Sequence, residues 1–245
     1  MFKIILLVVA AILITIGLVW LIDKFVPSKV RPLIILALWV LIAYLGYATY
    51  NSIMDPIAFN KVKNERYSQA IDKLIDIRDS ELAYRQVTGK FAGDFESLVK
   101  FVDTAHFTLT QRRDSTILDQ DMTKRYGVDM FKEITIVDTL GTRAVKDSLF
   151  KGSDRYKTMM NVPFAPNNEK FELQAGTIEQ SGIKIPVFEA KVKKDVLLHD
   201  QDKDLLIQEN QVVSVDGVNG DAIILGSMSE VKTTGNWPKN YGKDE

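Results

Sequence analysis

The amino-acid sequence predicts an α+β protein with an N-terminal transmembrane helical hairpin, a long stalk helix and a mainly antiparallel β-sheet domain. Three observations support this class. Two long apolar runs carry no charge, a segment of roughly thirty residues has helical periodicity, and several short segments alternate with period two between turns. The predicted boundaries are 1–54 for the hairpin, 55–90 for the stalk, 91–235 for the β-rich soluble domain and 236–245 for a flexible tail.

Both apolar runs are long enough to cross a membrane as helices. They cover residues 4–22 and 32–54, and neither contains a charged side chain. A hydrocarbon core roughly 30 Å thick needs about 20 apolar residues in a helix, because lipid offers no hydrogen-bond partners to the backbone. The residues taken to mark the membrane anchor are Ile4, Ile22, Leu33 and Tyr50.

The first run is predicted to be retained as an anchor. A cleaved signal peptide would end in small residues at A-x-A spacing, and none follow Ile22. Residues 23–31 are the only connection to the second run, so the two spans are expected to form an antiparallel hairpin. The connection carries more positive charge than either flank, which favours a cytoplasmic loop and an extracytoplasmic C-terminal domain. The orientation charges are Lys24, Lys29 and Arg31.

Composition excludes several functions for the domain after the second apolar run. From Asp55 onward the chain has 27 Lys+Arg and 31 Asp+Glu, a net charge of −4. This balance argues against nucleic acid as a partner, because such binding needs a basic face. The sequence contains no cysteine, which excludes disulfides, cysteine zinc sites and thiol nucleophiles.

The stalk helix is expected to begin where the second span ends. Asp55-Pro56 is predicted to break the span, with Asp55 as the N-cap of a new helix, and Gly89 provides a C-terminal stop. A coiled-coil seam continued from Ile71 would include Arg78 and Glu81, so we favour packing against the chain's own sheet over pairing between copies. A solvated connector without a partner remains an alternative. The apolar side of the helix comprises Tyr67, Ile71, Leu74, Ile75 and Leu82.

Beyond the stalk, local signals predict short helices and three strand pairs. Asp94 and residues 119–126 indicate two helical segments, and His106–Thr110 alternates as a strand. The predicted hairpins have turns at Leu140-Gly141, at Gln180-Ser181-Gly182 and at residues 216–220. Their strands cover 133–139 with 142–147, 170–179 with 183–193, and 211–215 with 222–225. Pro186 is expected at an edge or a bulge.

Asp200, Asp202 and Asp204 have the spacing that opens a calcium-binding EF-hand loop. The loop also needs glycine at its sixth position and glutamate at its twelfth, where this chain has Leu205 and Gln211. A capped helix start with solvated acids fits the pattern better, so the three aspartates and the neighbouring His199 are weak metal candidates. His106 is the only other histidine, and we predict no cofactor. The small basic clusters Arg112-Arg113 and Lys191, Lys193, Lys194 are expected to be solvated charge.

Several stretches of the sequence have a familiar pattern, namely 65–67, 70–78, 89–95, Leu98, 147–150 and 195–208. They resemble uncharacterised two-span membrane proteins of Bacteroidota, and this likeness implies no activity. A looser architectural likeness links the chain to pilins and pseudopilins, which run a membrane helix into a stalk and a small antiparallel sheet. The chain departs from pilins in having two spans and no processing site at its start.

These observations lead to two hypotheses of different class. The first is a non-enzymatic protein anchored in a bacterial inner membrane, whose periplasmic domain docks protein partners or copies of itself. It follows from the two spans and from the absence of a G-x-S-x-G, P-loop or G-x-G-x-x-G motif. The alternative is an extracytoplasmic ligand- or metal-sensing domain that uses Asp200, Asp202, Asp204 and His199. The lipid bilayer is a partner in both cases.

Overall fold

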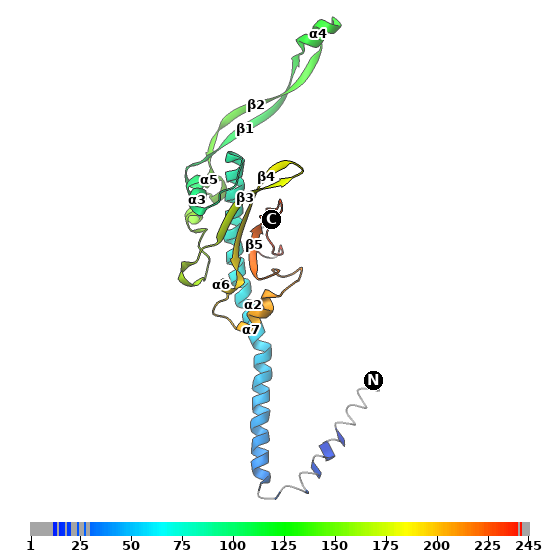
Figure 1. Cartoon of the computed structure of the whole chain (residues 1–245), viewed down its shortest axis with the longest axis vertical. Coiled ribbons are helices and arrows are strands. Elements are labelled where there is room, and N and C mark those ends of the chain that lie inside the picture. The colour runs from blue at the N-terminus through cyan, green and yellow to red at the C-terminus, as the bar shows by residue number, and fades with distance from the viewer. Residues whose placement is uncertain are drawn as a thin grey trace. The chain divides into compact units, whose positions relative to one another are not determined.

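The computed structural model is mixed α+β, with a long apolar helix near the N-terminus and two antiparallel sheets (Figure 1). The structure describes residues 12–13, 15–17, 19–20, 24, 27, 30–239 and 241. The chain divides into two compact units, Met1–Ala58 and Phe59–Glu245. Twelve of the 19 residues of the first predicted span lie outside the described residues, including Ile4 and Ile22, and so does Lys29. The helical hairpin is therefore untested.

Helix α2 extends without interruption from Arg31 to Thr88 and contains Pro56 in its interior. The predicted break at Asp55-Pro56 is therefore wrong, and Asp55 is not an N-cap. Proline removes one backbone hydrogen bond and crowds the preceding turn, but long helices tolerate this where the freed groups find other partners. In the described part of the chain, α2 is the one helix long and apolar enough to cross a membrane. Leu33 and Tyr50 on it are 70% and 61% exposed.

The later residues of α2 form one side of the core of the second unit. Tyr67, Ile71 and Leu74 are completely buried there, as the predicted apolar side requires, whereas Leu82 is 38% exposed. The core cluster joins them to residues of the three-stranded sheet, so the predicted packing of this helix within its own domain is confirmed. The helix ends before Gly89, whose φ of +79° suits the expected stop.

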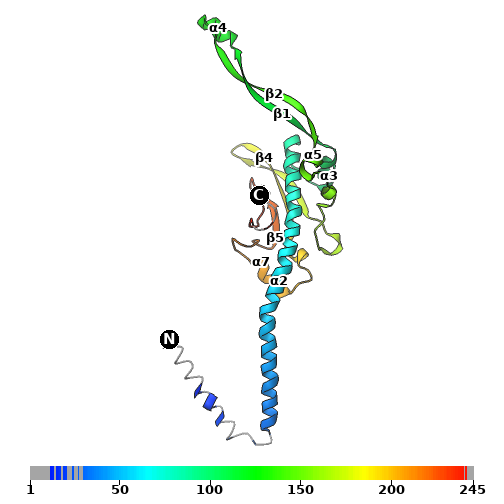
Figure 2. The same cartoon turned by 180° about the vertical axis from the view of Figure 1, so that it is seen from behind.

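The three-stranded sheet has the antiparallel order β3-β4-β5 and lies alongside α2 in both views (Figures 1 and 2). β3 and β4 are joined by a two-residue turn in which Ser181 and Gly182 both have positive φ, which confirms this predicted hairpin. β5 pairs only with residues 189–193 of β4, so Pro186 lies where β4 is an edge strand, also as predicted. The strands are β3 (Glu172–Gln180), β4 (Ile183–Lys193) and β5 (Ala222–Gly226).

Short helices complete the second unit, and they confirm the predicted cap at Asp94 and the predicted helical turn at residues 119–126. Asp94 accepts a hydrogen bond from Ser97 N at the start of α3, and Asp119 accepts from two backbone amides at the start of α4. The helices and 3₁₀ segments are α3 (Phe95–Thr104), α4 (Gln120–Tyr126), α5 (Val145–Phe150), η1 (Asp154–Thr158), η2 (Pro166–Asn168), α6 (Lys194–Leu197) and α7 (Lys203–Asn210).

The second sheet is a long two-stranded hairpin. β1 (His106–Leu118) pairs antiparallel with β2 (Phe131–Ala144), and α4 lies in the connection between them (Figure 1). The predicted turn at Leu140-Gly141 is wrong, because both residues lie inside β2. The register shifts there, since Leu109 faces Gly141 and Thr110 faces Thr139. Leu140 is thus the extra residue of a β-bulge, a feature whose local sequence resembles a turn.

Two further predictions near the C-terminus are wrong. Residues 211–215 form no strand, and Val213 and Val215 are each 91% exposed. The described part of the predicted flexible tail is packed, with Trp237 and Tyr241 lying against the core. Asn236 anchors this segment, because its backbone N–H donates to Ile224 O at 2.9 Å and its side-chain amide donates to Ala222 O at 2.8 Å.

Candidate functional site

The candidate metal residues are engaged in local structural roles. Asp202 caps α7, accepting hydrogen bonds from the backbone N–H groups of Asp204 and Leu205 at 2.9 and 3.0 Å, as the capped-helix interpretation predicted. Asp200 accepts two hydrogen bonds from Arg66, at 2.6 and 2.8 Å. These bonds hold the pKa of Asp200 well below its usual range.

Both histidines are exposed, and His199 lies with Nδ1 3.2 Å from Val196 O. In the described ranges, no group of three or more His, Asp or Glu side chains is placed to hold a metal ion. Asp202 therefore acts as a helix cap and Asp200 as one partner of an ion pair. The four candidate residues are not assembled into one metal site.

A buried ionic network, which the sequence did not reveal, lies between α2, α6 and α7. Lys194 is completely buried and donates to Glu209 O, Glu209 Oε1 and Val218 O at 2.8, 3.1 and 2.8 Å. Glu209 also accepts hydrogen bonds from Lys63 at 2.9 Å and Tyr67 at 3.3 Å. Burial lowers the pKa of Lys194 and raises that of Tyr67.

All three N–H donors of the Lys194 ammonium group are used within the fold, so the network has a structural role and connects α6 to α7. The expectation that Lys194 is solvated is wrong. Its neighbour Lys193 is exposed, as expected, and no local pattern distinguishes the two lysines.

A second buried charge-bearing group is Glu81 on α2. Its Oε2 accepts a hydrogen bond from Ala92 N–H at 2.8 Å, which ties the segment after α2 to the helix. Its Oε1 is buried with no hydrogen-bond partner among the described residues. Burial raises the pKa of Glu81 to about 8, so the carboxyl is largely protonated at neutral pH.

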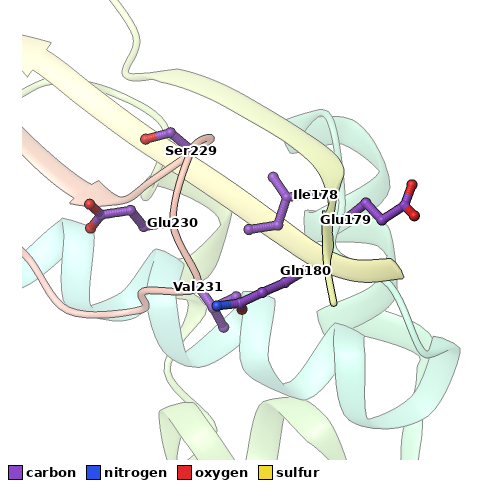
Figure 3. A pocket seen from close by; sticks show the side chains of 6 residues that line it. All are labelled: Ile178, Glu179, Gln180, Ser229, Glu230 and Val231. Atoms are coloured by element: carbon purple, nitrogen blue, oxygen red, sulfur yellow. The ribbon is translucent and has the colours of Figure 1, made fainter. Parts of the chain in front are cut away.

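The hollows on the second unit include two of ligand size. One, of about 560 Å³, is lined by apolar side chains that include Phe95, Val99 and Met160, together with charged side chains of both signs. The other, of about 490 Å³, lies between the end of β3 and the loop after β5, and Figure 3 shows the carboxylates of Glu179 and Glu230 pointing away from each other across it. Neither hollow brings a nucleophile, base and oxyanion donors together.

The β1–β2 hairpin has the largest concentration of exposed apolar side chains in the second unit. No residue of β1, α4 or β2 is buried. At the end of the hairpin, Tyr126, Val128 and Phe131 are 59%, 61% and 62% exposed. We call this group, with Met122 and Met130, the apolar tip. A two-stranded hairpin is marginally stable alone in water, and here both of its faces are left uncovered by the described part of the chain.

The charges of the hairpin are balanced. Arg113 and Asp138 form an ion pair at 3.0 Å across the strands, and Lys132 lies 3.7 Å from Asp119 near the tip. Between Asp119 and Lys132 the sequence has three acidic and three basic residues. The tip therefore offers apolar and mixed-charge contacts, which suit a protein surface better than a strongly charged one.

Comparison of the chain with protein-family models, curated proteins and solved structures found no match in any of the three. The predicted resemblance to two-span membrane proteins and the architectural likeness to pilins remain predictions. The function is consequently argued from the geometry of the chain itself.

Proposed function

We propose that the chain is a non-enzymatic, membrane-anchored protein of the bacterial cell envelope, whose β1–β2 hairpin docks protein partners outside the cytoplasm. The observation that carries the proposal is the exposed hairpin with its apolar tip. Exposed apolar clusters of this kind mark interaction surfaces, because leaving them in water costs free energy that a partner's surface recovers.

The membrane part of the proposal is supported by the composition of α2. Its first half is apolar and uncharged between Arg31 and Asp55. The basic residues Lys24, Lys29 and Arg31 before this segment favour the cytoplasmic side, which would direct the second unit to the periplasm of an inner membrane.

Thiol labelling tests this orientation, because the chain has no native cysteine. A protein with the single change Ser153→Cys should react with a membrane-impermeant maleimide in intact spheroplasts. Ser153 is exposed and precedes η1. Labelling that occurs only after lysis would place the second unit in the cytoplasm and overturn the proposed location.

Site-specific photocrosslinking tests the docking role. In cells that make the protein, p-benzoylphenylalanine in place of Val128 should give a defined crosslinked product, because the side chain is at the apolar tip. The matched control places the same probe at Val213, which is more exposed but lies outside the hairpin. We expect the product to disappear when Tyr126→Ser and Phe131→Ser are added. Equal crosslinking at both valines, or none at either, would contradict hairpin docking.

A further inference from the structure

Among the described strands, none pairs with the outer edge of β2. The two-stranded sheet consists of β1 and β2 alone, so one side of β2 pairs with β1 and the other side presents unpaired backbone N–H and C=O groups. Such an edge is a template for another strand unless charge, proline or a bulge blocks it. In β2 the bulge at Leu140 lies outside the stretch 131–139, whose register with β1 is regular.

This stretch is complementary to itself when two copies run antiparallel. With Thr135 opposite Thr135 of a second copy, Lys132 faces Asp138 and Ile134 faces Ile136. Each of these pairings occurs twice by symmetry. Opposite charges, apolar β-branched pairs and threonine pairs are the cross-strand combinations that stabilise antiparallel sheets.

The alternation of the strand places the favourable pairs on one face. Residues 132, 134, 136 and 138 point to the same side of β2, and so do their partners in the second copy. That face would carry four isoleucines in the middle and an ion pair at each end. The existing contacts of Lys132 with Asp119 and of Asp138 with Arg113 leave both charges accessible, because the side chains of Lys132 and Asp138 are 54% and 46% exposed.

The edge of β1 has two adjacent arginines, Arg112 and Arg113, at its centre. An antiparallel pairing about the middle of β1 would place Arg112 opposite Arg112 of the second copy. Like charges directly opposite one another destabilise a sheet. The charge pattern therefore favours β2 as the edge that pairs.

From this pattern we infer that the hairpin partner is a second copy of the chain, joined through β2 in a symmetric four-stranded sheet of order β1-β2-β2-β1. The inference rests on the proposed docking function and names its partner. The two-fold axis passes at Thr135, and the apolar tips lie at opposite ends of the shared sheet. Pairing covers one edge of each hairpin and replaces two marginally stable two-stranded sheets with one sheet of four strands.

A single cysteine at the symmetry axis tests the inference in the full-length protein in mild detergent. Directly opposed Cβ atoms in an antiparallel pair lie roughly 4.5–5.5 Å apart, within reach of a short bis-thiol crosslinker. Thr135→Cys should therefore give a crosslinked dimer as the main product. Thr116→Cys is the matched control, since it is an exposed threonine on β1 that would be separated from its copy by two intervening strands. Equal crosslinking of the two variants would overturn the inference.

A charge exchange provides a second and independent readout. Lys132→Asp places aspartate opposite Asp138 at two symmetric positions and should weaken dimerisation by roughly tenfold, measured by light scattering after size exclusion. Adding Asp138→Lys should restore the dimer, because opposite charges face each other again. Failure of the double variant to recover, with the single variant still folded, would contradict the proposed register.

The two proposals fail in different ways. If Thr135→Cys stays monomeric while the Val128 probe captures a different protein, the second-copy inference is wrong and the docking function stands. If neither experiment gives a product, both are wrong. A crosslinked dimer at Thr135 together with a Val128 product that contains a different protein would assign β2 to self-association and the tip to another partner.

Discussion

β4 and β2 are both antiparallel strands rich in β-branched residues, yet only β4 is buried. In β4 the side chains of Val187, Phe188 and Ala190 are at most 2% exposed, because this face of the strand packs with α2 in one core. In β2 no side chain is buried, because β1 is its only neighbour among the described strands and no layer covers either face. Strand chemistry alone thus does not decide burial; the covering layer does.

The difference has a consequence for how each region can respond to change. In the body around β4, side chains of distant segments fill one another's spaces, so a lost atom leaves a cavity. In the hairpin, a changed side chain exchanges its contacts for water at little cost. The body is therefore expected to govern stability and the hairpin to govern association.

The largest difference in stability between the body and the hairpin is expected when an ion pair is removed from each. Glu209→Ala should reduce the free energy of unfolding by about 3–5 kcal/mol, because it leaves Lys194 buried without its counter-charge. Arg113→Ala in the hairpin should cost no more than about 1 kcal/mol, since its pair with Asp138 is exposed. Urea titration of the full-length protein in mild detergent, followed by tryptophan fluorescence, measures both. Equal costs would show that the hairpin pair is buried in solution.

The second-largest difference in stability is expected for two isoleucines, one in each region. Ile71→Ala in α2 should cost about 2–5 kcal/mol, because the side chain is completely buried and its removal leaves a cavity. Ile117→Ala in β1 should cost less than about 1 kcal/mol, because this side chain is already 39% exposed. The same urea titrations decide the comparison. A cost at Ile117 that falls on dilution of the protein would indicate burial between copies.

The pH dependence of stability should report on Glu81. Its pKa in the folded state is about 8, above the value of 4.5 for an ordinary glutamate, so the folded state holds the proton more tightly. The resulting stabilisation is complete below about pH 4.5 and is lost as pH rises to about 8. Thermal melting across this window should show a decline that Glu81→Gln removes. An unchanged decline in the variant would assign the dependence to other groups.

The smallest effect concerns the turn between β3 and β4. Ser181 has a φ of +54°, a conformation that asparagine tolerates better than serine. Ser181→Asn should stabilise the protein by about 0.5 kcal/mol or less, visible as a small rise in the melting temperature. The β1–β2 hairpin has no equivalent position, because α4 lies in its connection. A loss of stability in this variant would argue against a positive φ at residue 181 in solution.

Local chemistry explains which elements were predictable. Asp94 and Asp119 cap their helices and Gly89 ends α2, because each acts on backbone groups a few residues away. The Ser181-Gly182 turn belongs to the same class of short-range signal. The predicted break of α2 at Pro56 was wrong because proline has only a local energetic cost, and a long helix can tolerate that cost.

The sequence by itself determined the α+β class, the apolar N-terminal helix, the end of α2, the starts of α3 and α4, and several of the residues of α2 that face the core. Only the tertiary structure decided that Leu140-Gly141 is a bulge within a paired strand, that Trp237 packs on the core, and that Lys194 and Glu81 are buried. Each of these features depends on contacts with residues far away along the chain, and the adjacent sequence does not indicate those contacts. Register and burial are properties of the packed chain, whereas caps and turns are properties of a few consecutive residues.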